Sequence, residues 1–392
     1  MDGTIALWFE PEAASESPAP KLSLHINVWK DISKTYNFLD IGFRISEAEN
    51  LGRFFLFFPA DLTGGAVSDL SRILKFGKIL HAVFNDVVEV TDSTEHYFRT
   101  ELDGSPFLMI HHLDPGQDIL VEPVLMEDGR VGSTVMFTDN LCARIRANTA
   151  TDHYVRIRLK LTDHLDQLLS SEVRSGDWRF ASAANDLELT EIRINERRSF
   201  PPEIARASKD RFFTIKSIHY FLIRHAERQL VLQYPEARKV RRLEPALWGP
   251  YLNDQPAIEA KRLKAVIGRL MIYHWRALAP AEKAAEKKGL FGKTSIPRDL
   301  GIDDYIAFAS FRKAQPNHWI YAVAIVILGA MGSCLHQAMK ELTFFGGQGL
   351  HISSPQILGS LFAALLVVYA ITIQPVRHAL SRAGRWLKSL MP

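Results

Sequence analysis

Polar and apolar residues alternate along several short segments in the first 235 residues. In residues 22–29, the apolar Leu22, Leu24, Ile26 and Val28 are separated by polar residues. Because successive side chains of a strand point to opposite faces, this spacing predicts a strand with one buried face. Comparable patterns predict further strands at 38–45, 53–58, 87–91, 105–111, 119–126, 131–137, 153–161 and 187–195. Residues 211–224 fit a strand and a helix equally well.

Helical spacing of apolar residues appears over 70–83 and becomes dominant after about residue 225. It predicts helices at 225–233, 257–277 and 281–288. We therefore expect an α+β fold in which a flexible N-terminus (1–20) precedes a β-rich cytoplasmic domain (21–235) and a basic helical connector (236–313).

The strand expected at 153–161 carries a basic face. Its apolar residues alternate with Arg156, Arg158 and Lys160, which we expect to be exposed. The simpler interpretation is a solvated face of a half-buried sheet. Basic side chains on one strand face can also follow a phosphate backbone, so nucleic-acid binding stays open.

Composition and charge limit the class of protein. Hydrophobic residues make up 47% of the chain and charged residues 23%, which excludes a disordered or collagen-like protein. Two cysteines exclude a disulfide scaffold and a four-cysteine zinc site. The net charge of +3 conceals an asymmetry, because residues 236–313 carry +7 and 314–392 carry +4, while the remainder is acidic. The basic part favours an anionic lipid first and a polyanion such as nucleic acid second.

Residues that could carry chemistry are few, and we assign no catalytic residue, cofactor or metal ligand. His111 and His112 are adjacent, so in a strand they point to opposite faces and cannot share a metal. Arg224-His225-Ala226 is similar to the Arg-His-Gly start of histidine phosphatases but lacks its glycine, and a histidine on a helix surface explains it better. A hydrolase or nucleotide sensor with no sequence signature remains a further alternative, which a deep polar pocket would reveal.

Two charge-free stretches lie near the C-terminus. Trp319–Leu335 has 17 residues and Ile352–Ile373 has 22. About 20 helical residues cross a hydrocarbon core of about 30 Å. The sequence therefore predicts a C-terminal two-helix transmembrane hairpin at 314–376, with two buried helices of a globular core as the alternative.

The flanks of these stretches carry residues typical of a membrane interface. Trp319 and Tyr321 open the first stretch. The segment after the second, 377–392, predicts a basic amphipathic tail on the membrane or a plain stop-transfer tail. Its expected interface residues are Arg377, Arg382, Arg385, Trp386 and Lys388. Positive flanks outside both spans predict a multi-pass protein of the bacterial inner membrane with both termini cytoplasmic.

Small residues recur at a spacing of four within both stretches. Gly329 and Ser333 form one such pair, and Gly359 and Ala363 form another. In lipid, this spacing lets helix backbones approach closely. It predicts packing within one hairpin and, as the more specific alternative, a homo-oligomer formed through several hairpins.

A large body followed by the spans Trp319–Leu335 and Ile352–Ile373 resembles the two-transmembrane effectors of bacterial anti-phage defence, in particular the retron-associated type. The resemblance implies that a reverse transcriptase with RNA-linked DNA holds the protein inactive. Its release would disrupt the bilayer of the inner membrane and cause abortive infection. The alternative is a membrane-tethered scaffold or sensor whose hairpin is only an anchor.

Overall fold

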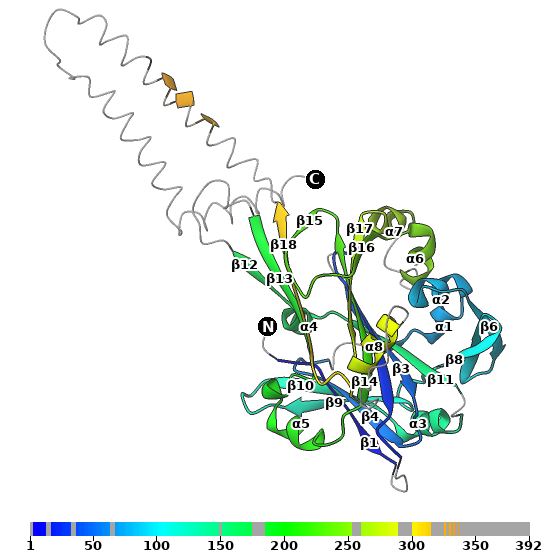
Figure 1. Cartoon of the computed structure of the whole chain (residues 1–392). Coiled ribbons are helices and arrows are strands. Elements are labelled where there is room, and N and C mark those ends of the chain that lie inside the picture. The colour runs from blue at the N-terminus through cyan, green and yellow to red at the C-terminus, as the bar shows by residue number, and fades with distance from the viewer. Residues whose placement is uncertain are drawn as a thin grey trace, which may run out of the picture. The chain divides into compact units, whose positions relative to one another are not determined.

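The computed structural model describes residues 3–12, 17–32, 37–62, 67–148, 151–174, 185–252, 260–288 and 300–314, together with seven helical residues between 325 and 336. Contacts divide the chain into two units. The main unit comprises Met1–Val173 and Leu187–Lys313, and the second unit comprises Arg174–Asp186 and Ala314–Pro392. The folded elements of the main unit are labelled in Figure 1.

The largest sheet has ten strands. Its order is β16 (Lys239–Arg242), β17 (Leu270–Leu278), β14 (Thr214–His225), β2 (Lys21–Trp29), β3 (Phe38–Ser46), β11 (Asp152–Lys160), β8 (Ser105–His111), β7 (Tyr97–Leu102) and β6 (Val88–Ser93), and β5 (Val67–Asp69) also pairs with β11. β2 runs parallel to β14 and β11 runs parallel to β8. The other neighbours are antiparallel.

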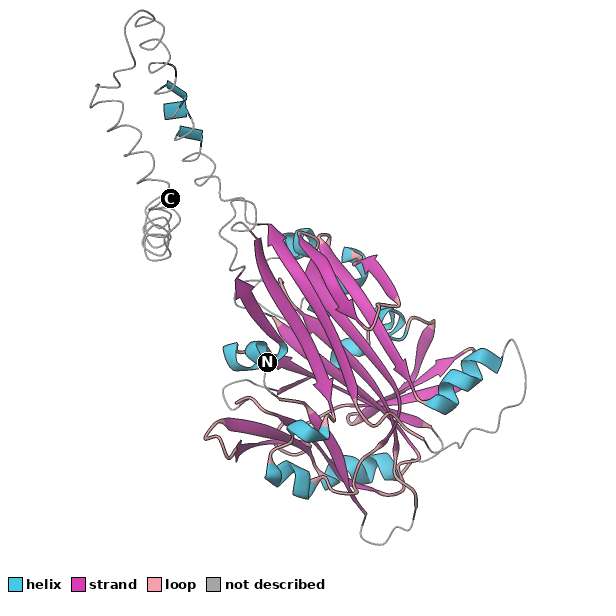
Figure 2. Cartoon of the chain, turned by 60° about the vertical axis from the view of Figure 1, so that its left-hand side comes forward, coloured by secondary structure: helices cyan, strands magenta, loops and turns pink. Residues whose placement is uncertain are grey.

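Two four-stranded sheets complete the β structure, whose long strands are prominent in Figure 2. One has the order β1 (Ala6–Pro11), β4 (Leu51–Phe58), β10 (Val131–Phe137) and β9 (Ile119–Leu125). The other has the order β12 (Ser170–Arg174), β13 (Asn185–Ile194), β18 (Tyr305–Ala314) and β15 (Arg228–Tyr234).

The described helices are short. They are α1 (Ser71–Leu74), α2 (Gly77–Phe84), α3 (Asp139–Arg146), α4 (Asp163–Leu169), α5 (Pro202–Ala207), α6 (Pro245–Leu252), α7 (Ala260–Ile267) and α8 (Pro280–Lys288), with a 3-10 turn at Arg197–Ser199.

Both faces of the ten-stranded sheet are covered in its centre. Val28, Ile41 and Ile157 point into the main apolar core, which also takes residues from both smaller sheets. A second apolar cluster, to which α1, α2, α6 and α7 contribute, includes Leu80 and Trp248. The polar residues that alternate with the first core therefore lie under a layer of helices and not in water.

Local periodicity predicted many of these elements correctly. The structure confirms the nine expected strand segments, which form β2, β3, β4, β6, β8, β9, β10, β11 and β13. It also confirms helical structure in two expected stretches: α1 and α2 lie at 70–83, and α8 lies at 281–288. The ambiguous stretch 211–224 forms a strand, β14. The helix expected at 225–233 is wrong, because β15 occupies it, and the second half of the helix expected at 257–277 is the strand β17.

The basic helical connector of the predicted fold class is also corrected. The described residues of 236–313 form three strands and three helices. β16 and β17 extend the ten-stranded sheet, and β18 pairs with β15. The run of basic residues suggested an exposed helical linker, whereas apolar residues such as Ile272 and Trp275 bury this stretch in the body.

The predicted membrane hairpin is corrected as well. Among the residues that the structure describes, no helix is both long and apolar enough to cross a membrane. Seven helical residues between 325 and 336 are described, most of them within the first stretch, and Ile352–Ile373 lies outside the described residues. An uncharged run establishes apolarity but does not by itself establish a spanning helix, so the multi-pass inner-membrane location that depended on the hairpin is not supported.

Candidate functional site

A row of polar residues crosses the centre of the ten-stranded sheet. His25 of β2 pairs with His219 of β14 on one side and with Gly42 of β3 on the other. Gly42 in turn pairs with Arg156 of β11. Directly paired residues share a face, so these side chains lie on the side that the helices cover.

The next row contains a buried ion pair. Arg158 Nε lies 2.7 Å from Asp40 Oδ1, and Arg158 Nη2 lies 3.1 Å from Asp40 Oδ2. The Tyr251 hydroxyl of α6 donates to Asp40 Oδ2 at 2.6 Å, and Trp29 Nε1 donates to the same oxygen at 3.0 Å. Asp40 is fully buried. The carboxylate is therefore saturated by one cation and two neutral donors.

Arg156 is surrounded by neutral partners. Its Nε donates to the Tyr251 hydroxyl, its Nη1 to the Tyr154 hydroxyl and its Nη2 to Asn27 Oδ1, each at 2.9 Å. Its exposed fraction is 1%, and no carboxylate of the described chain forms an ion pair with it. A guanidinium has five N–H donors, so two of them remain available on the terminal nitrogens.

We refer to Arg156, Arg158, Asp40, Tyr154 and Tyr251 as the arginine cluster. Burial raises the pKa of both tyrosines, so they remain neutral at ordinary pH. Burial opposes the charge of Arg156, but the oxygens of Tyr154, Tyr251 and Asp40 outweigh it and raise its pKa. The cluster thus contains two guanidinium groups and one carboxylate, which pairs with Arg158, and it carries a net charge of +1. A buried charge without a counter-charge costs several kcal/mol.

Gly42 makes room for this arrangement. A Cβ at this position would overlap the Tyr154 hydroxyl and would lie 3.1 Å from Arg156 Nη1. A glycine in the interior of a strand weakens the strand and commonly marks a close approach. Here it allows the side chains of β11 to extend across β3 toward the helices.

Three histidines continue the polar row away from the cluster. His25 and His219 lie side by side, with ring centroids 5.1 Å apart, and His219 Nδ1 is 3.3 Å from His274 Nε2. Burial and nearby cations lower the pKa of His25 well below its usual value, that of His219 to about 4 and that of His274 to about 3. The three rings are therefore neutral near pH 7. Within the described residues, no group of His, Cys, Asp or Glu side chains could hold a metal ion.

A small pocket opens beside Arg156, and we call it the arginine pocket. Its lining residues come from seven elements: His25, Asn27, Ala82, Val83, Arg156, Phe221, Arg241, Trp248 and Ile272. Both charged residues of this lining are arginines. The Asn27 oxygen must face Arg156, which only donates, so the amide nitrogen remains as a further donor. The enclosed part of the pocket is about 20 Å³, which is room for about one water molecule, and the pocket is partly open to solvent, so an oxyanion would lie partly in its mouth.

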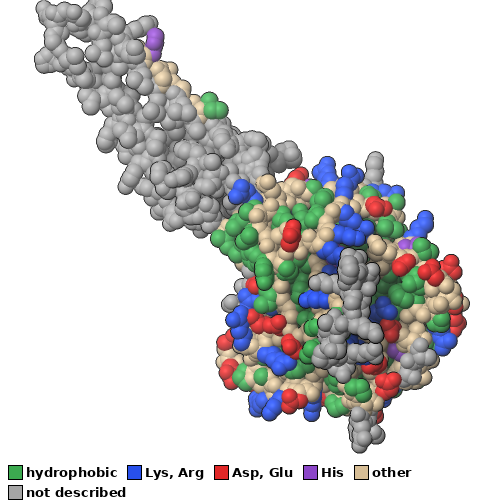
Figure 3. All heavy atoms as spheres, in the orientation of Figure 1, with side chains coloured by type: hydrophobic (Ala, Val, Ile, Leu, Met, Phe, Trp, Pro, Cys, Tyr) green, Lys and Arg blue, Asp and Glu red, His purple; other side chains and the backbone are tan. Residues whose placement is uncertain are grey.

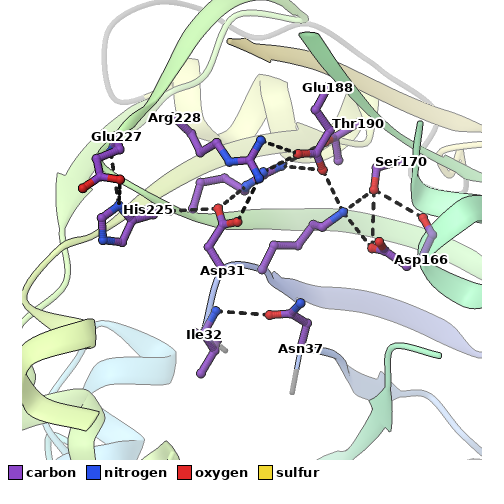
Figure 4. A network of polar contacts seen from close by, with 12 residues as sticks. Asp31, Ile32, Asn37, Asp166, Ser170, Glu188, Thr190, His225, Glu227 and Arg228 are labelled. Carbon is purple, nitrogen blue, oxygen red and sulfur yellow. Dashed lines mark hydrogen bonds and ion pairs between the residues drawn. The ribbon is translucent and has the colours of Figure 1, made fainter. Parts of the chain in front are cut away.

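A second polar cluster provides a contrast, and we call it the ion cluster (Figure 4). Arg224 Nη2 lies 2.6 Å from Glu188 Oε2, and Arg224 Nε lies 2.9 Å from Asp31 Oδ2. Lys30 Nζ lies 2.8 Å from Glu188 Oε1 and 2.7 Å from Asp166 Oδ1. Its six charged members are Lys30, Asp31, Asp166, Glu188, Arg224 and Arg228. Three cations therefore face three anions, so this cluster needs no ligand for charge balance.

The expected basic strand face is corrected. Arg156 and Arg158 are buried, whereas Lys160 is exposed. The alternation correctly separated the two faces of the strand, but a helix layer from elsewhere in the chain covers the basic one. Neither a solvated face nor a surface open to nucleic acid describes it.

Two other sequence predictions concern histidines. His111 and His112 point to opposite faces, as expected. His111 Nε2 lies 2.9 Å from His153 Nδ1, and His112 Nδ1 lies 2.6 Å from Ser71 Oγ. His225 is not on a helix surface, because it ends the strand β14.

Most of the predicted membrane residues cannot be placed. Gly329 and Ser333 are described, and the Ser333 hydroxyl donates to the Gly329 carbonyl at 3.0 Å within the same helical turn. The other predicted packing and interface residues lie outside the described residues: Trp319, Tyr321, Gly359, Ala363, Arg377, Arg382, Arg385, Trp386 and Lys388.

Sequence reasoning missed Asn27, Asp40 and Tyr251. Asn27 and Asp40 lie in strands that were recognised by their apolar residues, and Tyr251 lies in the stretch expected to be a connector. Arg241 was included in the basic charge of that connector. A useful signal was present, because Gly42 interrupts the otherwise large residues of the strand at 38–45.

Comparisons with known proteins add no family. No protein-family model matches the chain, and a search of curated proteins found no significant match.

Proposed function

We propose that the main unit is an anion-binding module and that the arginine pocket takes a small phosphate-like oxyanion. One observation carries the proposal. Arg156 is buried beside the pocket with three neutral partners and no carboxylate of the described chain in ion-pair contact. An anion in the pocket would supply the missing counter-charge.

The donors around the pocket favour a tetrahedral oxyanion over a halide. Arg156 keeps one N–H on each terminal nitrogen, which suits two oxygens of one ligand. The Asn27 amide and the Arg241 guanidinium supply further donors from other strands. Phosphate, with four acceptor oxygens, can use several of them together.

The proposed role is binding and not chemistry. The described lining holds no carboxylate and no serine or cysteine that could act as a nucleophile. His25 lines the pocket, but its lowered pKa leaves it neutral and its Nδ1 bonds to the Tyr154 hydroxyl at 3.2 Å. These features suit a sensor or a regulatory domain.

The test is a phosphate titration of the full chain followed by thermal denaturation, at constant ionic strength maintained with chloride. Phosphate should raise the melting temperature in a saturable way, and Arg156→Met should abolish that rise. Arg206→Met is the control, because Arg206 lies on α5 with 78% of its side chain exposed. No rise in the parent, or an equal rise in Arg156→Met, would overturn the proposal.

Membership of the retron-associated defence effectors stays a prediction. Within that prediction, we propose that the anion-binding module would be the regulated part. A reverse transcriptase with RNA-linked DNA and self-association also stay predictions as partners. Disruption of a membrane depended on the hairpin corrected above and is not proposed here.

A further inference from the structure

A basic strip lies at the edge of the ten-stranded sheet, and it consists of Arg238, Lys239, Arg241 and Arg242. All four residues are exposed. The last three belong to β16, which among the described strands ends the sheet and pairs with β17 alone. Figure 3 shows Lys and Arg side chains gathered over the end of the main unit where Figure 1 places β15, β16 and β17.

The residues that the structure describes do not neutralise most of this charge. Arg238 contacts Glu286 at 3.4 Å. Lys239, Arg241 and Arg242 form no ion pair with any described residue. The acidic Glu236 and Glu244 flank the strip in sequence but pair with none of its members. Lys239 and Arg241 lie on the helix-covered face of the sheet, whereas Arg242 pairs with Met271, which packs against the main core on the other face. Unpaired cations along one short edge strand are a typical electrostatic footprint for a polyanion.

The strip and the arginine pocket are continuous. Arg241 belongs to the strip and also lines the pocket. In the β16–β17 ladder, Lys239 pairs with His274 and Arg241 pairs with Ile272. Paired residues share a face, so Lys239 lies on the same side of the sheet as the polar row. An anion seated at Arg156 therefore has further cations along its exit to the surface.

We propose that the phosphate bound in the arginine pocket is the terminal phosphate of a single-stranded nucleic acid, whose following phosphates lie along the basic strip. This inference rests on the proposed function. A free phosphate could bind in the pocket but would not contact the cations of the strip. The depth of Arg156, which is 1% exposed, admits only the end of a strand, because an internal phosphate carries nucleotides on both sides.

An exposed aromatic residue supports a nucleic acid over a simple polyphosphate. Tyr234 ends β15 four residues before the strip, and 70% of its surface is exposed. Bases stack on exposed aromatic side chains without sequence preference, each contributing about 1–3 kcal/mol. A polyphosphate has no group that could use this ring.

The experiment measures fluorescence anisotropy of the full chain with a labelled oligothymidylate of about eight nucleotides, within the range of known single-strand sites. The strand carries a 5′-phosphate, a 3′-phosphate or hydroxyl groups at both ends. One phosphorylated end should bind at least about tenfold more tightly than the hydroxyl form, which corresponds to about 1.4 kcal/mol. Inorganic phosphate should compete for the difference.

Variants separate the pocket from the strip. Arg156→Met should remove the preference for a terminal phosphate, and Arg156→Lys should restore it in part. Lys239→Ala should weaken all three strands equally and flatten the salt dependence, by about 0.7 in slope for the one lost contact. Arg206→Ala, exposed on α5, should change neither quantity.

The outcomes distinguish the two proposals. If phosphate binds in a manner that needs Arg156 but no oligonucleotide binds, the inference is wrong and the anion-binding function stands. Equal binding of all three strands would also overturn the inference. If neither phosphate nor any strand binds, both proposals are wrong.

Discussion

Replacing Arg156 with methionine should destabilise the protein far less than the same replacement at Arg224. Both guanidinium groups are almost fully buried, so the two variants remove the same chemical group from equally buried positions. They differ in what remains. Arg224→Met leaves Glu188 and Asp31 with fewer cations, whereas Arg156→Met leaves only neutral acceptors.

The size of each effect follows from these partners. Breaking a buried ion pair by removing one member costs about 3–5 kcal/mol, and we expect this loss for Arg224→Met. Arg156→Met loses three hydrogen bonds from a charged donor, each contributing about 1.5–3 kcal/mol, but it also removes a buried charge without an ion-pair partner, which costs several kcal/mol. Its net cost should therefore be no more than about 2 kcal/mol. Phosphate at a hundred times its dissociation constant should stabilise the parent by about 2.7 kcal/mol.

Urea denaturation of the full chain at fixed ionic strength, with and without phosphate, measures all of these quantities. The expected result is a small loss for Arg156→Met with no response to phosphate. Arg224→Met should show a large loss and keep the phosphate response of the parent. If Arg156→Met costs as much as Arg224→Met and phosphate stabilises neither the parent nor a variant, the charge of Arg156 is balanced within the protein, and the reasoning fails.

Three further predictions concern other parts of the two clusters. Gly42→Ala places a Cβ against the Tyr154 hydroxyl. Phosphate affinity should therefore fall at least about tenfold, and the free energy of unfolding should fall by about 1–3 kcal/mol. Unchanged phosphate binding in a titration would contradict the role of this glycine. Burial opposes ionisation of Glu188, but its cations lower its pKa from 4.5 to about 2, so its contribution is present above pH 4.5 and lost as the pH falls toward 2. Urea denaturation across this range should therefore show the stability gap between the parent and Glu188→Gln shrinking by about 3 kcal/mol, and a constant gap would refute it. The pKa values of His219 and His274 are about 4 and about 3, and bound phosphate should raise both, so binding should take up protons and tighten as the pH falls below about 5. Calorimetry near this pH in two buffers of different ionisation enthalpy measures the uptake, and equal heats there would exclude it.

Local patterns predicted strands well where one face is apolar. The alternation around Ile26 and Ile157 located β2 and β11 because period-two burial depends only on neighbouring residues. The same reasoning failed at 270–277, where Tyr273 and Trp275 lie in a strand, because the surrounding helical spacing suggested a helix. Aromatic residues at alternate positions were the available signal.

The candidate site was beyond reach of these patterns. Periodicity placed Arg156 opposite an apolar face but could not show that α6, from residues about 90 positions later, covers it. The missing information was long-range pairing. Asn27, Arg156 and Arg241 meet only because β2, β11 and β16 are strands of one sheet, and a single sequence carries no signal for that order.

The parallel pairing of β2 with β14 has a consequence for synthesis of the chain. Leu24 pairs with Ile218, which leaves the ribosome 194 residues later. At about 5–20 residues per second, one edge of β2 waits roughly 10–40 s for its neighbour. During that interval its unpaired N–H and C=O groups can template association with another nascent chain. The yield of folded protein should therefore depend on how quickly translation reaches β14.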